Sequence, residues 1–243
     1  ERIPMATLPC IFISTILSQA AGASAGKEGA ALQIGGCIGN YFGDVFNMDE
    51  RDKKVMIMSG MSGCFGAIFG TPLAAAMFGI EVISIGVAYY AALVPCVFAS
   101  FIGAQISGAL GLHGESFQIL HIPEFSLVPA LYTVGLGLAC ALLSVFFCIL
   151  LHETQHLYKN KIENVYARIL VAAGLSIALA FIFGRDYCGA GFNLVEKAVD
   201  GESAYLGFLL KMIFTAIALG GGFKGGEIVP TLAVGSSFGC TFG

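Results

Sequence analysis

Two glutamates lie in glycine-rich stretches of a chain that is otherwise strongly apolar. Glu28 occurs in GASAGKEGAALQIGG, residues 22–36, and Glu227 in GGGFKGGEIVPTLAVGSSFG, residues 220–239. Each glutamate stands where an apolar run typical of a helix begins. A helix start exposes unpaired N–H groups and carries about half a positive charge. Two such starts facing one another could bind an anion without a full cation, and glycines let an ion approach the backbone.

A carboxylate at the same place would compete with the bound anion. When ionised, Glu28 would occupy the site, and when protonated it would swing away and admit the anion. One side chain would then serve as both gate and proton carrier. We therefore predict gating and proton transfer by Glu28 and Glu227, and anion binding by the backbone amides of Gly26, Lys27, Gly29, Ala30, Gly226, Ile228 and Val229.

Structural roles for the two glutamates remain open alternatives. Glu28 could pair with the adjacent Lys27 or simply cap a helix, and Glu227 could be a loop carboxylate near Lys224. Ionisable residues inside a membrane are functional by default, which favours the first interpretation for Glu28. Two other charged residues in apolar runs receive no function: Glu81 is expected at a solvated helix end, and Lys211 is expected to extend its ammonium toward the membrane surface.

An internal repeat relates the two stretches. A shift of 200 residues places Ala30 on Pro230, Leu32 on Leu232 and Ile34 on Val234. The same shift aligns the ridges formed by glycines 35 and 39 and by glycines 235 and 239, which predict close helix approach. With 33 glycines in the chain, some matches arise by chance. Paired breaks in corresponding halves nevertheless point to a transporter site.

The composition predicts an integral membrane protein. The chain is 57% hydrophobic and 12% charged, about half the charge of a soluble domain. Residues 55–112 contain one charged side chain and residues 125–152 contain none. Because about 20 apolar residues span a bilayer, these runs contain several spans, and an unusually apolar soluble protein is the weaker alternative. Apolar segments are expected at 4–21, 30–43, 54–70, 72–84, 86–111, 127–151, 165–184, 204–220 and 230–243.

The distribution of basic residues predicts how the chain crosses the membrane. The connection at 51–54 and the one containing Lys159 and Lys161 are basic, so we place both in the cytoplasm. The segment 112–126 carries Glu115 and Glu124 without lysine or arginine, and we place it outside. Residues 54–84 must then pass out and back.

Short apolar segments flanked by glycine breaks indicate broken helices. The exposed backbone of such a break is tolerated inside a membrane where protein covers it or water fills a cavity beside it.

Several other kinds of function lack support in the sequence. The eight cysteines show no metal-binding spacing, so we expect no metal, no cofactor and no disulfide framework. The net charge of −4 gives no reason to expect nucleic acid as a partner. An intramembrane hydrolase using either glutamate as a base lacks support, because no histidine stands near Glu28 or Glu227 in the sequence. A purely structural scaffold would rarely need paired charges at helix breaks.

At these residues the chain resembles the CLC family of chloride channels and proton-coupled anion transporters. GKEGA at 26–30 is similar to the family's GREGP motif, whose glutamate is the external gate, and LQIGG at 32–36 continues as the family does. GGEIVP at 225–230 is similar to the segment ending in the GxFxP motif, which opens a helix that binds the central anion. TPLA at 71–74 and GAGFN at 189–193 also agree, so the likeness spans nearly the whole chain in order.

The departures from the family pattern point to fluoride. Lys27, Ala30 and Ile228 replace the usual arginine, proline and phenylalanine, and Glu227 replaces a small or apolar residue. The inner proton glutamate of the chloride exchangers is replaced by Val82. An acid beside the anion resembles the fluoride/proton antiporter branch, in which a protonated carboxyl could donate to fluoride. A chloride channel or chloride/proton exchanger of the same fold is the alternative.

The resemblance also implies an architecture. We expect an all-α polytopic membrane protein, a CLC-type inverted-repeat helical bundle with short, broken and tilted helices. Residues 1–243 would form one transmembrane domain cut at both ends, with residues 1–112 from the first repeat and 125–243 from the second. A selectivity segment would precede residue 1 and a tyrosine-bearing helix would follow residue 243. The family forms homodimers, here partly through residues 72–110, and we expect a bacterial plasma membrane protein that moves fluoride or chloride with protons.

Overall fold

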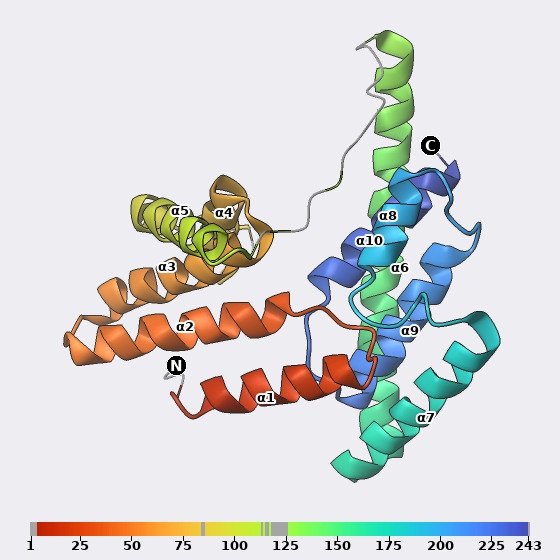
Figure 1. Cartoon of the computed structure of the whole chain (residues 1–243), viewed down its shortest axis with the longest axis horizontal. Helices are drawn as coiled ribbons and strands as arrows, with labels where there is room; N and C mark the ends of the chain where they lie inside the picture. The colour runs from red at the N-terminus through yellow and green to blue at the C-terminus, as the bar shows by residue number, and fades with distance from the viewer. Residues whose placement is uncertain (1–3, 84–85, 113, 115–116, 118–125, 243) are drawn as a thin grey trace. The chain divides into compact units, whose positions relative to one another are not determined.

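The computed structural model describes residues 4–83, 86–112, 114, 117 and 126–242, and this part of the chain is almost entirely helical (Figure 1). Its regular elements are α1 (Thr7–Ala20), α2 (Glu28–Val45), α3 (Glu50–Phe69), α4 (Pro72–Glu81), the 3-10 turn η1 (Tyr90–Ala92), α5 (Leu93–Ala109), α6 (Leu127–Lys161), α7 (Val165–Phe183), α8 (Phe192–Val199), α9 (Gly207–Gly221) and α10 (Ile228–Phe242). Nine of the α-helices correspond to the nine apolar segments that the sequence predicts.

The largest differences from the predicted segments occur at polar ends and at one short helix. α6 continues ten residues beyond the predicted end at 151, through a polar stretch that finishes at Lys161. Hydropathy detects only the part of a helix that lies in hydrocarbon. The polar continuation of α6 beyond residue 151 therefore could not be predicted from hydropathy. The eight-residue α8 is amphipathic and was not among the predicted segments. Glu115 and Glu124, which supported the predicted orientation, lie outside the described residues.

The chain forms two compact units. The first unit contains residues 1–14 and 28–116, and the second contains residues 15–27 and 117–243. The second unit therefore includes the end of α1 and the break that precedes α2. The assignment of residues 1–112 and 125–243 to two repeats of one domain stays a prediction.

In the first unit, α3 is the central helix. It packs against α2, α4 and α5, and a core of Met58, Ala76, Ile80, Ala92 and Cys96 joins α3, α4 and α5. The α2–α3 contact is backbone against backbone: a Cβ on Gly35 would fall on the carbonyl of Gly60, and one on Gly60 would fall on the carbonyl of Gly35. The predicted ridge of glycines 35 and 39 is thus in close contact with its neighbour.

This contact predicts a large difference between adjacent glycines. Gly35→Ala should lower the free energy of unfolding by about 1–3 kcal/mol, because backbone atoms must move to make room. Gly36→Ala is the matched control, since its new methyl would meet the flexible Met61 side chain at 3.3 Å. Thermal unfolding of both variants in detergent measures the difference. Equal melting temperatures would contradict the packing described here.

The ends of the first unit agree with the predicted out-and-back path. At one end Arg51 donates a hydrogen bond to the hydroxyl of Tyr89 over 3.2 Å, and the Lys54 ammonium lies 5.1 Å from the ring centre of Tyr89. At the other end Gly114 packs against the carbonyl of Phe69. Residues 51–54 and 89 therefore lie at the end opposite residues 69 and 114. Assignment of the basic end to the cytoplasm stays a prediction.

In the second unit, α9 is the central helix. It packs against α6, α7 and α10, and α8 covers α10 (Figure 1). The core between α6, α9 and α10 contains Phe147, Leu151, Phe208, Met212, Ala216 and Val234. Glycines 235 and 239, predicted to allow close helix approach, have no atom within 4 Å of an added Cβ in the described part of the chain. That expectation is therefore not met here, because no described helix packs on this side of α10.

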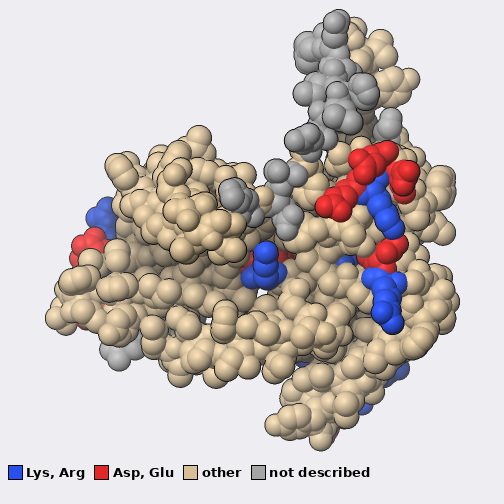
Figure 2. All heavy atoms as spheres, in the orientation of Figure 1, with Lys and Arg blue, Asp and Glu red and all other residues tan. Residues whose placement is uncertain are grey.

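Three helices are long and apolar enough to cross a membrane, judged by length and composition over the described residues. They are residues 90–109, 127–161 and 165–183, and four shorter apolar helices accompany them. Charged side chains are sparse on the face shown in Figure 2 and gather mainly over α8. There Lys197 forms an ion pair with Asp186, 2.6 Å apart.

Candidate functional site

The two glycine-rich breaks are joined to each other by their backbones. Gly26 and Gly226 form an isolated antiparallel bridge, in which the Gly26 N–H donates to the Gly226 carbonyl at 2.7 Å and the Gly226 N–H donates back at 2.8 Å. These are the two positions that the 200-residue shift of the sequence superposes. A reciprocal bond between equivalent residues is what a local twofold relation between the breaks would produce.

The break before α2 is held along its whole length. The helix α1 ends at Ala20, and Gly22 then takes a left-handed conformation with φ of 75°. Its carbonyl accepts from the Gly189 N–H at 3.4 Å, and the Ala25 carbonyl accepts from the Gln19 amide at 2.7 Å. Backbone carbonyls removed from water need hydrogen-bond partners. In this break the partners come from the end of α1 and from the turn before α8.

The break before α10 packs tightly on the first one. The Lys224 N–H donates to the Ser18 hydroxyl at 3.0 Å. A Cβ on Gly225 would lie 2.5 Å from the Cβ of Ala25 and 3.0 Å from the carbonyl oxygen of Gly26. The two backbones approach so closely that position 225 has room only for hydrogen.

A helix start follows each bridge residue at the same interval. α2 begins at Glu28, two residues after Gly26, and α10 begins at Ile228, two residues after Gly226. Glu28 is thus the first residue of its helix and Glu227 directly precedes the other. The first N–H groups of a helix have no partner within it and favour negative charge. Both breaks therefore lead into positions suited to an anion or a carboxylate.

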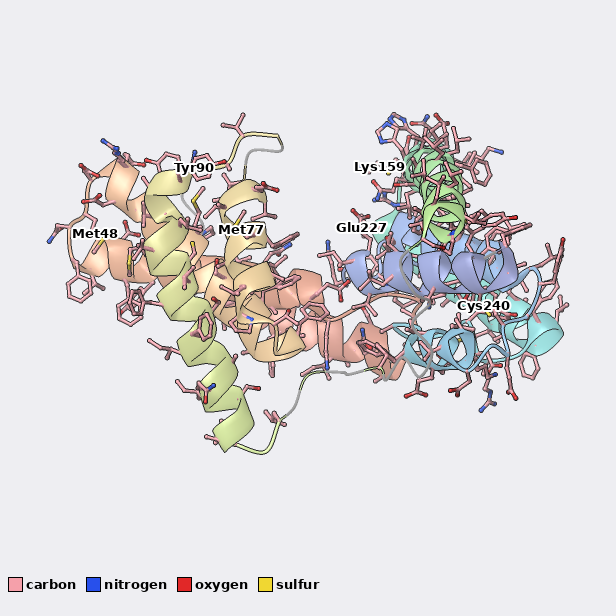
Figure 3. The ribbon with its side chains drawn as sticks, turned by 90° about the horizontal axis from the view of Figure 1, so that it is seen from above. Met48, Met77, Tyr90, Lys159, Glu227 and Cys240 are labelled. Carbon is pink, nitrogen blue, oxygen red and sulfur yellow. The ribbon has the colours of Figure 1, made fainter. Side chains whose placement is uncertain are left out.

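The predicted site residues differ strongly in exposure. Glu28 is fully buried at 0% exposure, and Val229 and Ala30 are also buried. Gly26 and Gly226 are buried, Gly29 and Ile228 are partly buried, and Lys27 and Glu227 are exposed. Figure 3 labels Glu227 at the start of α10 and Cys240 toward the other end of this helix. A buried Glu28 next to an exposed Lys27 argues against a simple surface ion pair.

The structure brings together only part of the predicted set. Gly26, Lys27 and residues 226–229 belong to the second unit, where the bridge joins the two breaks. Glu28, Gly29 and Ala30 follow directly in the chain and belong to the first unit. Glu81, the last residue of α4, is exposed as expected for a solvated helix end.

Lys211 is the residue whose role the sequence analysis missed. We expected its ammonium to extend to the membrane surface, but the side chain is 0% exposed. The ammonium instead donates to the Ser24 hydroxyl and to two backbone carbonyls before α8. The only sequence signal was a lone lysine in an apolar helix, one turn before Thr215, and its partners are remote in sequence.

Comparisons with known proteins identify the family of this chain. The family model described as voltage gated chloride channel matches residues 1–243. A "Chloride/fluoride channel protein" of Pseudomonas syringae pv. tomato is 34% identical, over 98% of this chain and 54% of its own length. The "H(+)/Cl(-) exchange transporter ClcA" of Vibrio cholerae is 27% identical, over 97% and 52%. The chain spans about half the length of the curated relatives that it matches.

Solved structures confirm the expected fold. A crystal structure of a CLC-type fluoride/proton antiporter superposes with a TM-score of 0.93 at 30% identity, covering 98% of this chain and 61% of that one. A slow cyanobacterial Cl−/H+ antiporter superposes with a TM-score of 0.69 at 24% identity, covering 93% and 55%. The inverted-repeat bundle of short, broken helices expected from the sequence is therefore confirmed.

Proposed function

Because this chain belongs to the voltage gated chloride channel family, we propose that it forms part of a fluoride exporter that exchanges fluoride for protons. It is a multi-pass integral membrane protein, and we place it in a bacterial plasma membrane. The observation that carries the proposal is the reciprocal bridge between Gly26 and Gly226, from which the chain continues into two helix starts. The alternatives, a hydrolase or a scaffold, gain nothing from this arrangement.

The anion is proposed to bind at the amides that follow the bridge. Dehydrating an anion inside a membrane is costly unless hydrogen-bond donors replace its water. Amides at the start of a helix point toward such an ion and carry a favourable dipole. The proposed donors are those of Lys27, Gly29, Ala30, Ile228 and Val229. The amides of Gly26 and Gly226, also expected from the sequence, are excluded because each already donates to the carbonyl of the other.

Glu28 is the proposed gate and proton carrier. It is fully buried and is the first residue of α2, where the helix start provides N–H donors. The ionised side chain would compete with fluoride for the same donors. Protonation of Glu28 would remove that competition and open the site to fluoride. Each opening of the site would then bring in a proton on Glu28, and fluoride would move in the opposite direction.

Glu227 supports fluoride over chloride. Its carboxyl precedes α10 and, when protonated, could donate a strong hydrogen bond to the small and strongly accepting fluoride ion. Similarity to a chloride/fluoride channel protein and to a fluoride/proton antiporter supports this choice. The second candidate, a chloride channel or chloride/proton exchanger, is favoured by the exposure of Glu227, which does not require contact with the ion. As in the family, the protein would act as a homodimer.

Flux measurements in liposomes test the proposal. A fluoride gradient should drive proton movement in the reconstituted protein, whereas an equal chloride gradient should drive much less. Equal proton movement with the two ions would support the chloride exchanger instead.

Glu227→Ala should reduce the preference for fluoride over chloride by about 10- to 100-fold, since hydrogen bonds to charged groups contribute roughly 1.5–3 kcal/mol. Ion-selective electrodes on the same liposomes measure both anion fluxes. Glu196→Ala is the matched control, because Glu196 is an exposed glutamate on α8. Unchanged selectivity in Glu227→Ala would remove this residue from the site.

A further inference from the structure

Lys211 lies in the second turn of α9, and its ammonium group is enclosed by oxygen acceptors. The Nζ atom donates to the Gly189 carbonyl at 2.7 Å, to the Ser24 hydroxyl at 2.9 Å and to the Tyr187 carbonyl at 3.2 Å. An ammonium has three N–H donors, and these three acceptors use all of them. Among the described residues no carboxylate forms an ion pair with it. All the groups involved belong to the second unit.

The hydroxyl protons around Lys211 can be assigned from the same contacts. Thr215 Oγ1 donates to the Lys211 carbonyl at 2.9 Å, so it must accept from Ser24, whose hydroxyl lies 2.9 Å away. Ser24 in turn accepts from the Lys211 ammonium. The result is a closed ring of hydrogen bonds running from the ammonium through Ser24 and Thr215 back to the backbone of Lys211.

Close packing leaves the lysine side chain little freedom. A Cβ on Gly191 would lie 2.8 Å from Lys211 Cε and 3.1 Å from its Nζ. Gly191 caps α8 in a left-handed conformation with φ of 101°. The end of the side chain therefore sits between the turn before α8 and the break that contains Ser24.

A buried charge without a partner charge is an expensive way to stabilise a fold. Removing an amino group from water is costly, and its hydrogen bonds to neutral acceptors largely offset that cost without adding much stability, so stability alone does not explain Lys211. Its three bonds instead connect α9 to two non-helical segments. One of them, residues 22–26, carries the Gly26 end of the bridge, and the other, residues 187–189, donates to Gly22 through Gly189.

We propose that Lys211 is a positioning residue that clamps residues 22–26 and 187–189 to α9 and so fixes the bridge between Gly26 and Gly226. Its contribution to transport rests on the function proposed above. The clamp itself is a property of the backbone and can be measured without any transported ion.

Lys211→Met removes the three bonds while keeping an unbranched apolar stem. Hydrogen exchange in the detergent-solubilised protein, read at single residues by mass spectrometric fragmentation, should become at least tenfold faster at the amides of Gly26, Gly189 and Gly226. Lys211→Arg, which keeps a charged donor, should recover part of the protection. Lys197→Met is the matched control, because Lys197 pairs at the surface with Asp186, which directly precedes residues 187–189. This variant should leave exchange at Gly26 unchanged.

Two milder variants keep the lysine and guard against a failure of Lys211→Met to fold. Ser24→Ala and Thr215→Val each open the ring of hydrogen bonds, and each should speed exchange at Gly26 and Gly226 about threefold or more. Unchanged exchange at these amides in both variants, or in a folded Lys211→Met protein, would overturn the clamp.

Transport provides the second readout. Lys211→Met should lower the maximal fluoride flux about tenfold while Lys197→Met keeps the normal rate. Faster exchange together with a wild-type protein that moves no fluoride would retain the clamp and reject the proposed function. A fall in flux with unchanged exchange would reject the clamp and retain the function.

Discussion

The Glu28→Gln protein will carry fluoride without exchanging it for protons, and proton flux should fall by at least about 100-fold. Glutamine has nearly the same size and keeps polar atoms at the fully buried start of α2, so the fold should be retained. It cannot take up or release a proton, and positioned proton transfer typically contributes about 100- to 10,000-fold in rate. Fluoride and pH electrodes applied to the same liposomes measure the two fluxes together.

A second glutamate in an apolar part of the chain provides the control for this experiment. Glu81→Gln alters the exposed last residue of α4 and should leave coupling unchanged. Proton exchange that continues at the normal ratio in Glu28→Gln would show that another group carries the proton.

A single methyl group at position 225 should strongly reduce the fluoride flux itself. In Gly225→Ala the new Cβ would lie 2.5 Å from the Cβ of Ala25 and 3.0 Å from the Gly26 carbonyl. Overpacking of this kind costs about 1–3 kcal/mol, and the strain is relieved most directly by separating the two breaks. Fluoride flux should therefore fall by about 10- to 100-fold in liposomes.

Gly174→Ala is the matched control for this substitution. Gly174 lies on α7, where no described atom is within 4 Å of an added Cβ, and alanine favours the helix. Its flux and melting temperature should match or exceed those of the parent protein. Normal flux in Gly225→Ala would mean that the close contact of the two breaks is not needed for transport.

Much of the helical organisation could be predicted from the sequence because hydropathy and the bilayer impose it together. The start of α4 at Pro72 coincides with its predicted segment, and the start of α7 coincides equally well. The pairing of the breaks was also accessible, because the 200-residue shift superposes the two glycines that form the bridge. Apolar runs and internal repeats are visible in the order of residues along the chain, so helix positions and the pairing of the breaks can be predicted from it.

The features that escaped prediction depend on contacts between remote residues. Nothing near Lys211 in the sequence indicates that Ser24, 187 positions away, accepts a hydrogen bond from it. The short helix α8 has too few residues for a hydropathy signal, and its start depends on a left-handed Gly191. Likewise, the two predicted glycine ridges look alike, but only that of Gly35 meets a neighbouring backbone in the described chain.

Because Gly26 and Gly226 are each both donor and acceptor for the other, neither strand can slide or withdraw alone without rupturing both contacts at once. The two breaks are thus held together at these two residues. A displacement of the first break at Gly26 is therefore expected to move the second break at Gly226 with it. Under the function proposed above, uptake of a proton at one break and release of a halide at the other would then be coupled through the main chain.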